Sequence, residues 1–291
     1  HGQGAETIMR AEALFYQGHV TDAHIELERA YAQVGGNGQI NMALCCDFLS
    51  WRLSLYTDVE RRYTFSERYA ALLRYHDASW INIWSATSAY YHALRGETDK
   101  IPEIFSQHRL SDIHLLAPGK PMMEMIENQV YLAQGAYAKV VGRSAELLAA
   151  CEAMHYALVA LHIRIQTAAA YARLGKPETA HAWLQKALSD AAPDGLVMPF
   201  AENYSLLKPL LARETRSAFA ARITALGEAA QARGAERLRP AAFRALAARE
   251  FEIVELMAQR LSNREIAQKC YLSEGSVKQY VNQIYSKLHI E

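Results

Sequence analysis

The sequence has few cysteines, no long apolar run and no excess of either charge. Four cysteines occur in 291 residues and none forms a C-x-x-C pair, which argues against a disulfide framework. Reduced, buried thiols are typical of cytoplasmic proteins, so we expect a cytoplasmic protein. No apolar run approaches the roughly 20 residues of a membrane span, and no signal segment opens the chain, so we expect no membrane contact. The cysteines are Cys45, Cys46, Cys151 and Cys270.

Sequence patterns of catalysis, of metal binding and of nucleotide binding are also missing. Pro118-Gly119-Lys120-Pro121 has neither the earlier glycine nor the Ser or Thr of a phosphate-binding P-loop. His155 and His162 could share a helix face, but no cysteine or carboxylate joins them at ligand spacing. No nucleophile elbow and no paired-carboxylate site stands out. We therefore predict that the chain is not an enzyme and that these residues hold no cofactor.

What the sequence does contain is an internal repeat within residues 5–190, which are predicted to be helical nearly throughout. Similar short segments centre on four glycines, of which the last three lie 39 and 40 residues apart (135 − 96 and 175 − 135). The gap between the first two is two periods long, with its midpoint at Thr57. The spacing predicts five units of about 39 residues. The glycines are Gly18, Gly96, Gly135 and Gly175.

The repeated glycine has a physical reason. A helix commonly ends at a residue in the left-handed conformation, which favours glycine. The next helix then begins within a few residues, as at Pro177, because proline suits a first helical turn. Each unit is therefore predicted to be an antiparallel helix pair, and such pairs bury their apolar faces by stacking. The predicted fold class is all-α, with a superhelix of tetratricopeptide-like repeats over residues 1–232.

Large aromatic side chains are frequent in the first helix of the repeats. In stacked helix pairs the first helices line the concave side, and an aromatic-lined concavity can hold a small molecule or a protein segment. We therefore predict an effector groove, while packing between the layers is the alternative for each single aromatic. The groove residues are Trp51, Trp80, Trp84, Tyr91, Tyr131 and Tyr171.

The helical pattern breaks after residue 232. One more Ala-rich helix is expected over about 216–232, and Arg233-Gly234 and Arg239-Pro240 then indicate a linker over 233–245. The opening His1-Gly2-Gln3-Gly4 resembles an added peptide, so we expect the sequence to be part of a longer protein.

The segment 246–291 carries two helix starts in close succession. Ser262 and Glu265 stand three apart, as a capping box requires, and Ser273 is positioned to cap a second helix. An apolar stripe follows at the spacing of one helix face, formed by Val277, Val281, Ile284 and Leu288. Two capped helices a turn apart, the second polar on its other face, are the pattern of a helix-turn-helix whose second helix enters the DNA major groove.

The polar face of that second helix predicts which side chains meet DNA. Lys278, Gln279 and Asn282 lie together opposite the apolar stripe, and their side chains can pair with guanine or adenine edges. Three flanking residues should meet phosphates and fix the register without reading sequence. The residues predicted to contact phosphate are Asn263, Ser276 and Lys287.

The segment resembles the LuxR-type DNA-binding domain in Arg249-Glu250, in SNREIA, in LSEGSVK and in Lys287-Leu288. The resemblance implies that Lys278, Gln279 and Asn282 face the bases of double-stranded promoter DNA. Three features depart from the family. Arg260 stands where such domains usually have glycine, Cys270 stands where they usually have leucine, and the sequence ends before their final helix.

A second resemblance concerns residues 194–211, which are similar to the end of the repeat domain of MalT-like regulators. It implies a large ATP-dependent activator in which a nucleotide-binding, self-associating module precedes a helical-repeat sensor for a small-molecule or protein effector. That module would lie outside this sequence.

Two functions remain open at this stage. The first is a transcription regulator that senses an effector and binds a promoter; the second is a repeat scaffold for protein–protein interaction with a terminal docking module. Beyond residue 245 six basic residues stand against six acidic ones. Because phosphate attraction scales with the cations placed at the backbone, we expect one copy to bind DNA weakly and the protein to self-associate.

Overall fold

The computed structural model of the chain describes residues 4–34, 40–58, 64–73, 78–113, 119–238, 243 and 245–288. Within these ranges the chain forms helices and turns and no β-strand, so the predicted all-α fold class is confirmed. By its internal contacts the chain divides into two compact units. We call His1–Gln231 the N-terminal unit and Ala232–Glu291 the C-terminal unit.

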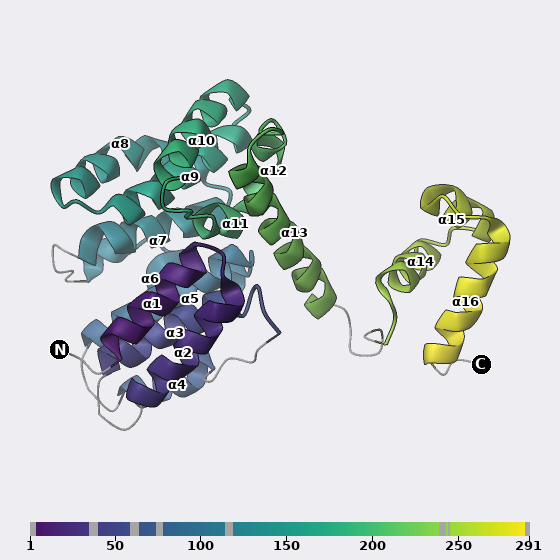
Figure 1. Cartoon of the computed structure of the whole chain (residues 1–291), viewed down its shortest axis with the longest axis horizontal. Coiled ribbons are helices and arrows are strands. Elements are labelled where there is room, and N and C mark those ends of the chain that lie inside the picture. Colours follow the sequence, from purple (N-terminus) through teal and green to yellow (C-terminus); the bar gives the residue numbers. More distant parts are fainter. Residues whose placement is uncertain are drawn as a thin grey trace. The chain divides into compact units, whose positions relative to one another are not determined.

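The N-terminal unit is built mainly of antiparallel helices packed side by side (Figure 1). α1 packs on α2, α7 on α8, and α9 on both α8 and α10. The helices are α1 (Ala5–Tyr16), α2 (Val20–Val34), α3 (Ile40–Leu53), α4 (Phe65–Leu72), α5 (Ala78–Leu94), α6 (Glu103–Ser106), α7 (Lys120–Ala133), α8 (Tyr137–Ala153), α9 (Ala157–Arg173), α10 (Pro177–Ala191), α11 (Met198–Glu202), α12 (Tyr204–Leu211) and α13 (Ala218–Leu238). The last seven residues of α13 belong to the C-terminal unit.

The four glycines of the sequence repeat end the helices α1, α5, α7 and α9 with the same backbone conformation. All four have left-handed backbone, with φ between 69° and 81°. At Gly175, for example, the amide donates to the Ala172 carbonyl at 3.2 Å, and the next amide donates to the Tyr171 carbonyl at 3.0 Å. This is the double hydrogen bond of a Schellman motif. Thr57, the fifth predicted turn, lies in a bend after α3, so all five predicted turns lie outside helices.

The second and third helix pairs are less regular than predicted. α4 has eight residues, and the segment after α5 contains only the four-residue α6 between the 3-10 turns Thr98–Lys100 and Leu110–Asp112. α6 starts directly after Pro102 and ends before His108, which has left-handed backbone with φ of 56°. Where a full second helix was predicted, α5 therefore has a one-turn helix beside it.

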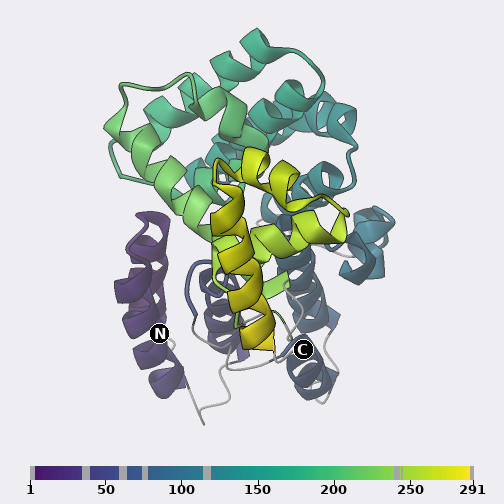
Figure 2. The same ribbon diagram turned by 90° about the vertical axis from the view of Figure 1, so that its right-hand side faces the viewer.

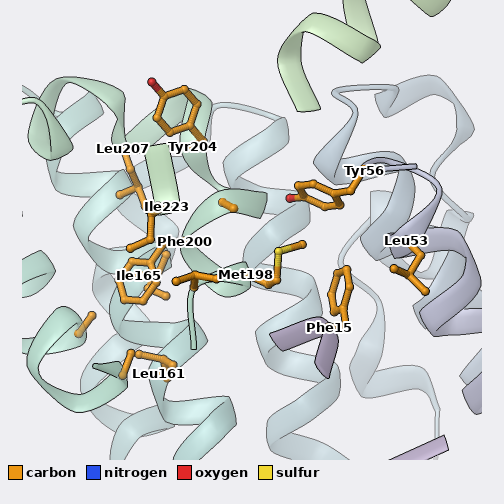
Figure 3. Packing of buried hydrophobic residues seen from close by; sticks show 14 of the residues in the cluster. Phe15, Leu53, Tyr56, Leu161, Ile165, Met198, Phe200, Tyr204, Leu207 and Ile223 are labelled. Carbon is orange, nitrogen blue, oxygen red and sulfur yellow. The ribbon is translucent and has the colours of Figure 1, made fainter. Parts of the chain in front are cut away.

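The core of the N-terminal unit joins helices that are far apart in the sequence. In Figure 3 the side chain of Met198 lies between Phe15 on one side and Phe200 and Ile165 on the other. Met198 and Phe200 belong to the short helix α11, and all four side chains are almost completely buried. The core thereby holds α1, α9 and α11 together.

A buried ion pair crosses the same core. The guanidinium of Arg52, on α3, donates to the carboxylate of Glu202, on α11, at 2.6 and 3.0 Å. Their side chains are 2% and 0% exposed. The hydroxyl of Tyr90 also donates to Glu202, and Arg52 donates to the hydroxyl of Tyr16. A buried pair of this kind adds little net stability, but the loss of one partner is costly because it leaves the other charge unpaired.

The predicted linker 233–245 differs from the structure at its start. α13 runs on to Leu238, so Arg233 and Gly234 lie inside the helix. One glycine costs a helix only about 1 kcal/mol, which a helix of this length can absorb. Residues 239–242 and 244, including Pro240, lie outside the described part of the chain.

The C-terminal unit continues with three helices, α14 (Ala248–Ala258), α15 (Asn263–Cys270) and α16 (Glu274–Leu288). α16 packs on both α14 and α15, as Figure 2 shows. The three enclose a small core of their own, whose buried members are Leu246, Ile253, Ile266, Ala267, Cys270, Val277 and Ile284.

Candidate nucleic-acid interface

α15 begins with the predicted capping box. The Ser262 hydroxyl accepts from the Glu265 amide at 3.4 Å, and the Glu265 carboxylate accepts from the Ser262 amide at 2.8 Å. The hydrogen bonds from Ser262 lower the pKa of Glu265, which therefore remains ionised at neutral pH. A negative charge at this place also suits the positive end of the helix dipole. Cys270, at the other end of α15, is 1% exposed and belongs to the core of the unit.

α16 begins three residues after α15 ends, and its serine cap is also as predicted. The Ser273 hydroxyl accepts from the Ser276 amide at 3.0 Å and lies 2.8 Å from the Ser276 hydroxyl. Val277 and Ile284 are buried, and Val281 and Leu288 pack at the edge of the same core. This fixes the rotation of the helix about its axis, because the four apolar residues must face inward.

The opposite face of α16 is open to solvent. Lys278, Gln279 and Asn282 are all exposed, and their spacing of one and four residues places them on one side of the helix. None of the three forms a hydrogen bond or ion pair with another described residue. The predicted base-reading side chains are thus brought together, and no described group competes for them.

The three predicted phosphate contacts lie in different settings. Asn263 is the first residue of α15 and is half-buried. Ser276 is also half-buried, and its hydroxyl shares a hydrogen bond with the cap. The ammonium of Lys287 lies 2.8 Å from both carboxylate oxygens of Glu250. Lys287 therefore has a structural role that its place in the sequence did not indicate.

Glu250 was identified from the sequence only as part of a motif, and its structural role was not predicted. It is 3% exposed, and its carboxylate accepts from the Ala247 amide at 2.6 Å as well as from Lys287. The hydrogen bond from Lys287 is the main cause that lowers the pKa of Glu250. The one local signal is its place three residues into α14, where a glutamate reaches back to the amide before the helix. Glu250 thus ties the start of α14 to the end of α16.

A further contact joins α14 to the end of α15. The guanidinium of Arg249 donates to the backbone carbonyl of Cys270 and, at 2.7 Å, to Glu252. Two of the six basic residues beyond residue 245 therefore have partners inside the unit. In the described part of the chain the other four form no ion pair, and all are exposed: Arg260, Arg264, Lys269 and Lys278.

The predicted effector groove is not a single surface. Trp51 and Tyr91 are 1% and 4% exposed, and they pack against each other with ring centroids 6.4 Å apart. They belong to the interior because their large rings fill the space between α3 and α5. Trp80 and Tyr171 are half-buried. Trp84 and Tyr131 line two different pockets.

No helix in the described ranges is long and apolar enough to cross a membrane. No group of three or more His, Cys, Asp or Glu side chains in these ranges could hold a metal ion.

Comparison with known proteins identifies the C-terminal unit. The family model described as "Bacterial regulatory proteins, luxR family" matches residues 244–291. No curated protein and no solved structure matches the chain. The matched residues include all three helices of the motif and its exposed polar face. The C-terminal unit therefore contains a LuxR-type helix-turn-helix domain that binds double-stranded DNA, as expected of a transcriptional regulator.

Proposed function

We propose that the chain is part of a transcription activator whose α16 reads promoter bases through Lys278, Gln279 and Asn282. The observation that carries the proposal is the exposed polar face of α16 opposite its buried stripe. An interaction helix that docked on a protein would present apolar anchors there. Lysine can donate to guanine, and glutamine and asparagine can form paired hydrogen bonds with adenine.

The N-terminal unit acts in this proposal as the sensor of an effector or partner. Support comes from its helix pairs joined by the repeated glycine turns, and from the resemblance of residues 194–211 to the end of the repeat domain of MalT-like activators. A tetratricopeptide-like superhelix offers a concave surface to a small molecule or a protein. The proposed setting is the cytoplasm, with the ATP-binding module of such activators outside these residues.

Self-association follows from the charges of the C-terminal unit. Lys287 and Arg249 are engaged internally, and four exposed cations remain for the phosphates. Each phosphate contact lowers log K by about 0.9 per tenfold rise in salt. One copy should thus show a salt slope of roughly 4 at most, and tight promoter binding requires two or more copies.

The test is selection of duplexes from a random DNA pool by the full chain, followed by titration of the enriched duplex across salt concentrations. We expect one base pattern to be enriched, with a salt slope of at most about 4 for each copy bound. A repeat scaffold, the alternative function, predicts no enrichment and no binding above that of random DNA. Lys278→Ala and Asn282→Ala should each cost about 1–3 kcal/mol and relax the preference at one base pair.

A further inference from the structure

A pocket of about 670 Å³ lies beside the irregular third helix pair. Its walls come from α4, from one face of α5 and from residues 100–104 around α6. A full second helix at this place would cover that face of α5, as α10 covers α9. The pocket therefore lies where the second helix of the pair is reduced to the one turn of α6.

The wall formed by α5 carries polar side chains on a face that is largely buried. Ile81, Ser85, Ser88 and His92 line the pocket at the spacing of one helix face. Ser85 and Ser88 are 7% and 3% exposed. Among the described residues neither hydroxyl has a hydrogen-bond partner. Both side chains line the pocket, so a bound molecule with a donor or an acceptor can pair with their free hydroxyls.

An aromatic pair flanks the two serines. The rings of Tyr69, on α4, and Trp84, on α5, lie 4.7 Å apart at 37°. Tyr69 is 37% exposed, and both residues line the pocket. Ring pairs of this kind favour an offset arrangement and can be extended by a further flat ring.

The charges around the pocket do not favour an ion. The ring of His92 hydrogen-bonds to Glu97 at 2.8 Å, and burial lowers the pKa of His92, so the ring is neutral at neutral pH. Lys100 and Glu103 carry opposite charges and are both exposed. The other lining residues are apolar or neutral, including Asn82, Ile104 and Ile113.

We propose that this pocket binds an uncharged small molecule with a flat aromatic ring and one or two hydrogen-bonding groups. The ring stacks on Trp84 and Tyr69, and the polar groups pair with Ser85 and Ser88. The assignment rests on the proposed role of the N-terminal unit as a sensor, and it names the effector class and its site.

A second pocket supplies a matched control. It measures about 580 Å³, lies between α7 and α8, and is lined by Tyr131 and by charged residues of both signs, among them Lys139 and Arg143. Gly142 also lines it, and a Cβ atom added there would meet no atom within 4 Å. Gly142→Leu should thus partly fill this second pocket without disturbing the fold or the pocket beside α5.

The test uses the fluorescent probe N-phenyl-naphthylamine, an uncharged aromatic amine, titrated into the full chain. The matched ligand control is anilinonaphthalene sulfonate, which has nearly the same ring skeleton and a negative charge. We expect the uncharged probe to bind at least tenfold more tightly. Trp84→Ala should weaken its binding about three- to tenfold, and Ser88→Leu should block it, while Gly142→Leu leaves it unchanged.

The double variant Ser85→Ala/Ser88→Ala separates binding from folding. It loses no hydrogen bond within the described chain, so it should be at least as stable as the parent, yet it should bind the probe several-fold more weakly. Equal binding by parent, Ser88→Leu and the double variant would overturn the assignment. So would preferential binding of the charged probe.

Failure of this inference and failure of the proposed function give different results. If the probe does not bind beside α5 but the chain still selects a DNA sequence, the pocket assignment is wrong and the regulator proposal stands. If the probe binds as expected but no DNA sequence is selected, the pocket assignment stands and the regulator proposal is wrong.

Discussion

The two units end their helices with the same backbone motif but build it from different residues. In the N-terminal unit four of the left-handed positions are the repeat glycines, although His108 and His155 also occur there. In the C-terminal unit the corresponding positions are Arg260 after α14 and Tyr271 after α15, with φ of 60° and 54°. A left-handed residue with a side chain costs roughly 1–2 kcal/mol, and the C-terminal unit carries that cost twice.

The two units also differ in how their helices begin. α7, α8, α9 and α10 begin without a side-chain cap, although Thr64 caps α4 and Ser217 caps α13. In the C-terminal unit serines cap α15 and α16. A small domain buries a smaller fraction of its surface and has less stability to spare. The C-terminal unit therefore depends on the caps of α15 and α16, while the stacked helices α7 to α10 depend on their packing.

Each unit also contains a buried glutamate that forms an ion pair with a basic residue. Glu202 and Arg52 are both buried, but Lys287, the partner of Glu250, has a side chain that is 43% exposed. Water can reach the second pair and screen it, so the same kind of pairing should matter more in the N-terminal unit.

Glu202→Leu should destabilise the N-terminal unit by about 3–5 kcal/mol, because it leaves the Arg52 charge buried without its partner. Urea unfolding followed by tryptophan fluorescence measures this, since all four tryptophans lie before residue 232. The double variant Arg52→Met/Glu202→Leu should regain most of the loss. If the double variant is no more stable than Glu202→Leu, the cost lies in packing and not in the unpaired charge.

Acid should weaken the N-terminal unit before the C-terminal unit. Burial, aided by the Arg52 charge, lowers the pKa of His162 from 6.5 to about 3. The unfolded chain therefore takes up this proton below pH 6.5 while the folded chain does not, and stability falls as the pH falls from 6.5 towards 3. In the C-terminal unit the pKa values of Glu250 and Glu265 lie below 4.5. Their contribution is present above pH 4.5 and is lost only below it.

Tryptophan fluorescence between pH 7 and pH 5, in the presence of a fixed urea concentration, checks the acid effect. His162→Phe keeps the ring contacts with Tyr16 and Tyr90, at 6.2 and 6.4 Å, and should remove most of the pH dependence. Burial also lowers the pKa of His92, so a part of the pH dependence should remain in this variant. An unchanged pH profile in His162→Phe would contradict the assignment.

Lys287→Met and Lys278→Met should separate folding from DNA binding within the C-terminal unit. Lys287→Met removes two hydrogen bonds to the buried Glu250 and should cost about 1.5–3 kcal/mol of stability. Lys278→Met should leave stability unchanged and weaken binding to the selected DNA. The thiol of Cys270 is 1% exposed, so its labelling rate, followed by mass spectrometry, reports opening of this unit.

The labelling also decides the role of Lys287 on DNA. Faster labelling of Cys270 in Lys287→Met than in Lys278→Met would agree with the structural role. If Lys287→Met labels no faster than the parent and weakens all DNA equally, the lysine acts mainly as the phosphate contact that the sequence predicted.

Arg260→Gly should stabilise the C-terminal unit by roughly 1 kcal/mol, because glycine adopts the left-handed conformation without strain. Arg260 is exposed, so little packing is lost. The matched control in the N-terminal unit is Gly175→Arg, which should destabilise that unit by a similar amount. Slower labelling of Cys270 in Arg260→Gly is the expected observation. Faster labelling would mean that the arginine makes a stabilising contact.

Much of the fold and part of the site followed from local sequence. The glycine spacing predicted all five turns, and the positions of Ser262, Glu265 and Ser273 predicted the two caps. The spacing of Val277 and Ile284 fixed which face of α16 is buried. Such features depend on contacts within one or two helical turns, and residues three or four apart always meet on a helix. The turns, the caps and the buried face of α16 are therefore predictable without knowledge of the fold.

Only the tertiary structure decided which residues meet across long distances. Arg52 and Glu202 stand 150 positions apart, and Lys287 reaches Glu250 across the C-terminal unit. The same packing buried Trp51 and left Trp84 at the edge of a pocket. Helical spacing gives the direction of a side chain but not what lies opposite it. Burial, pairing and pockets depend on how whole helices stack, so the sequence by itself determined the helices and their ends, and the packing determined the rest.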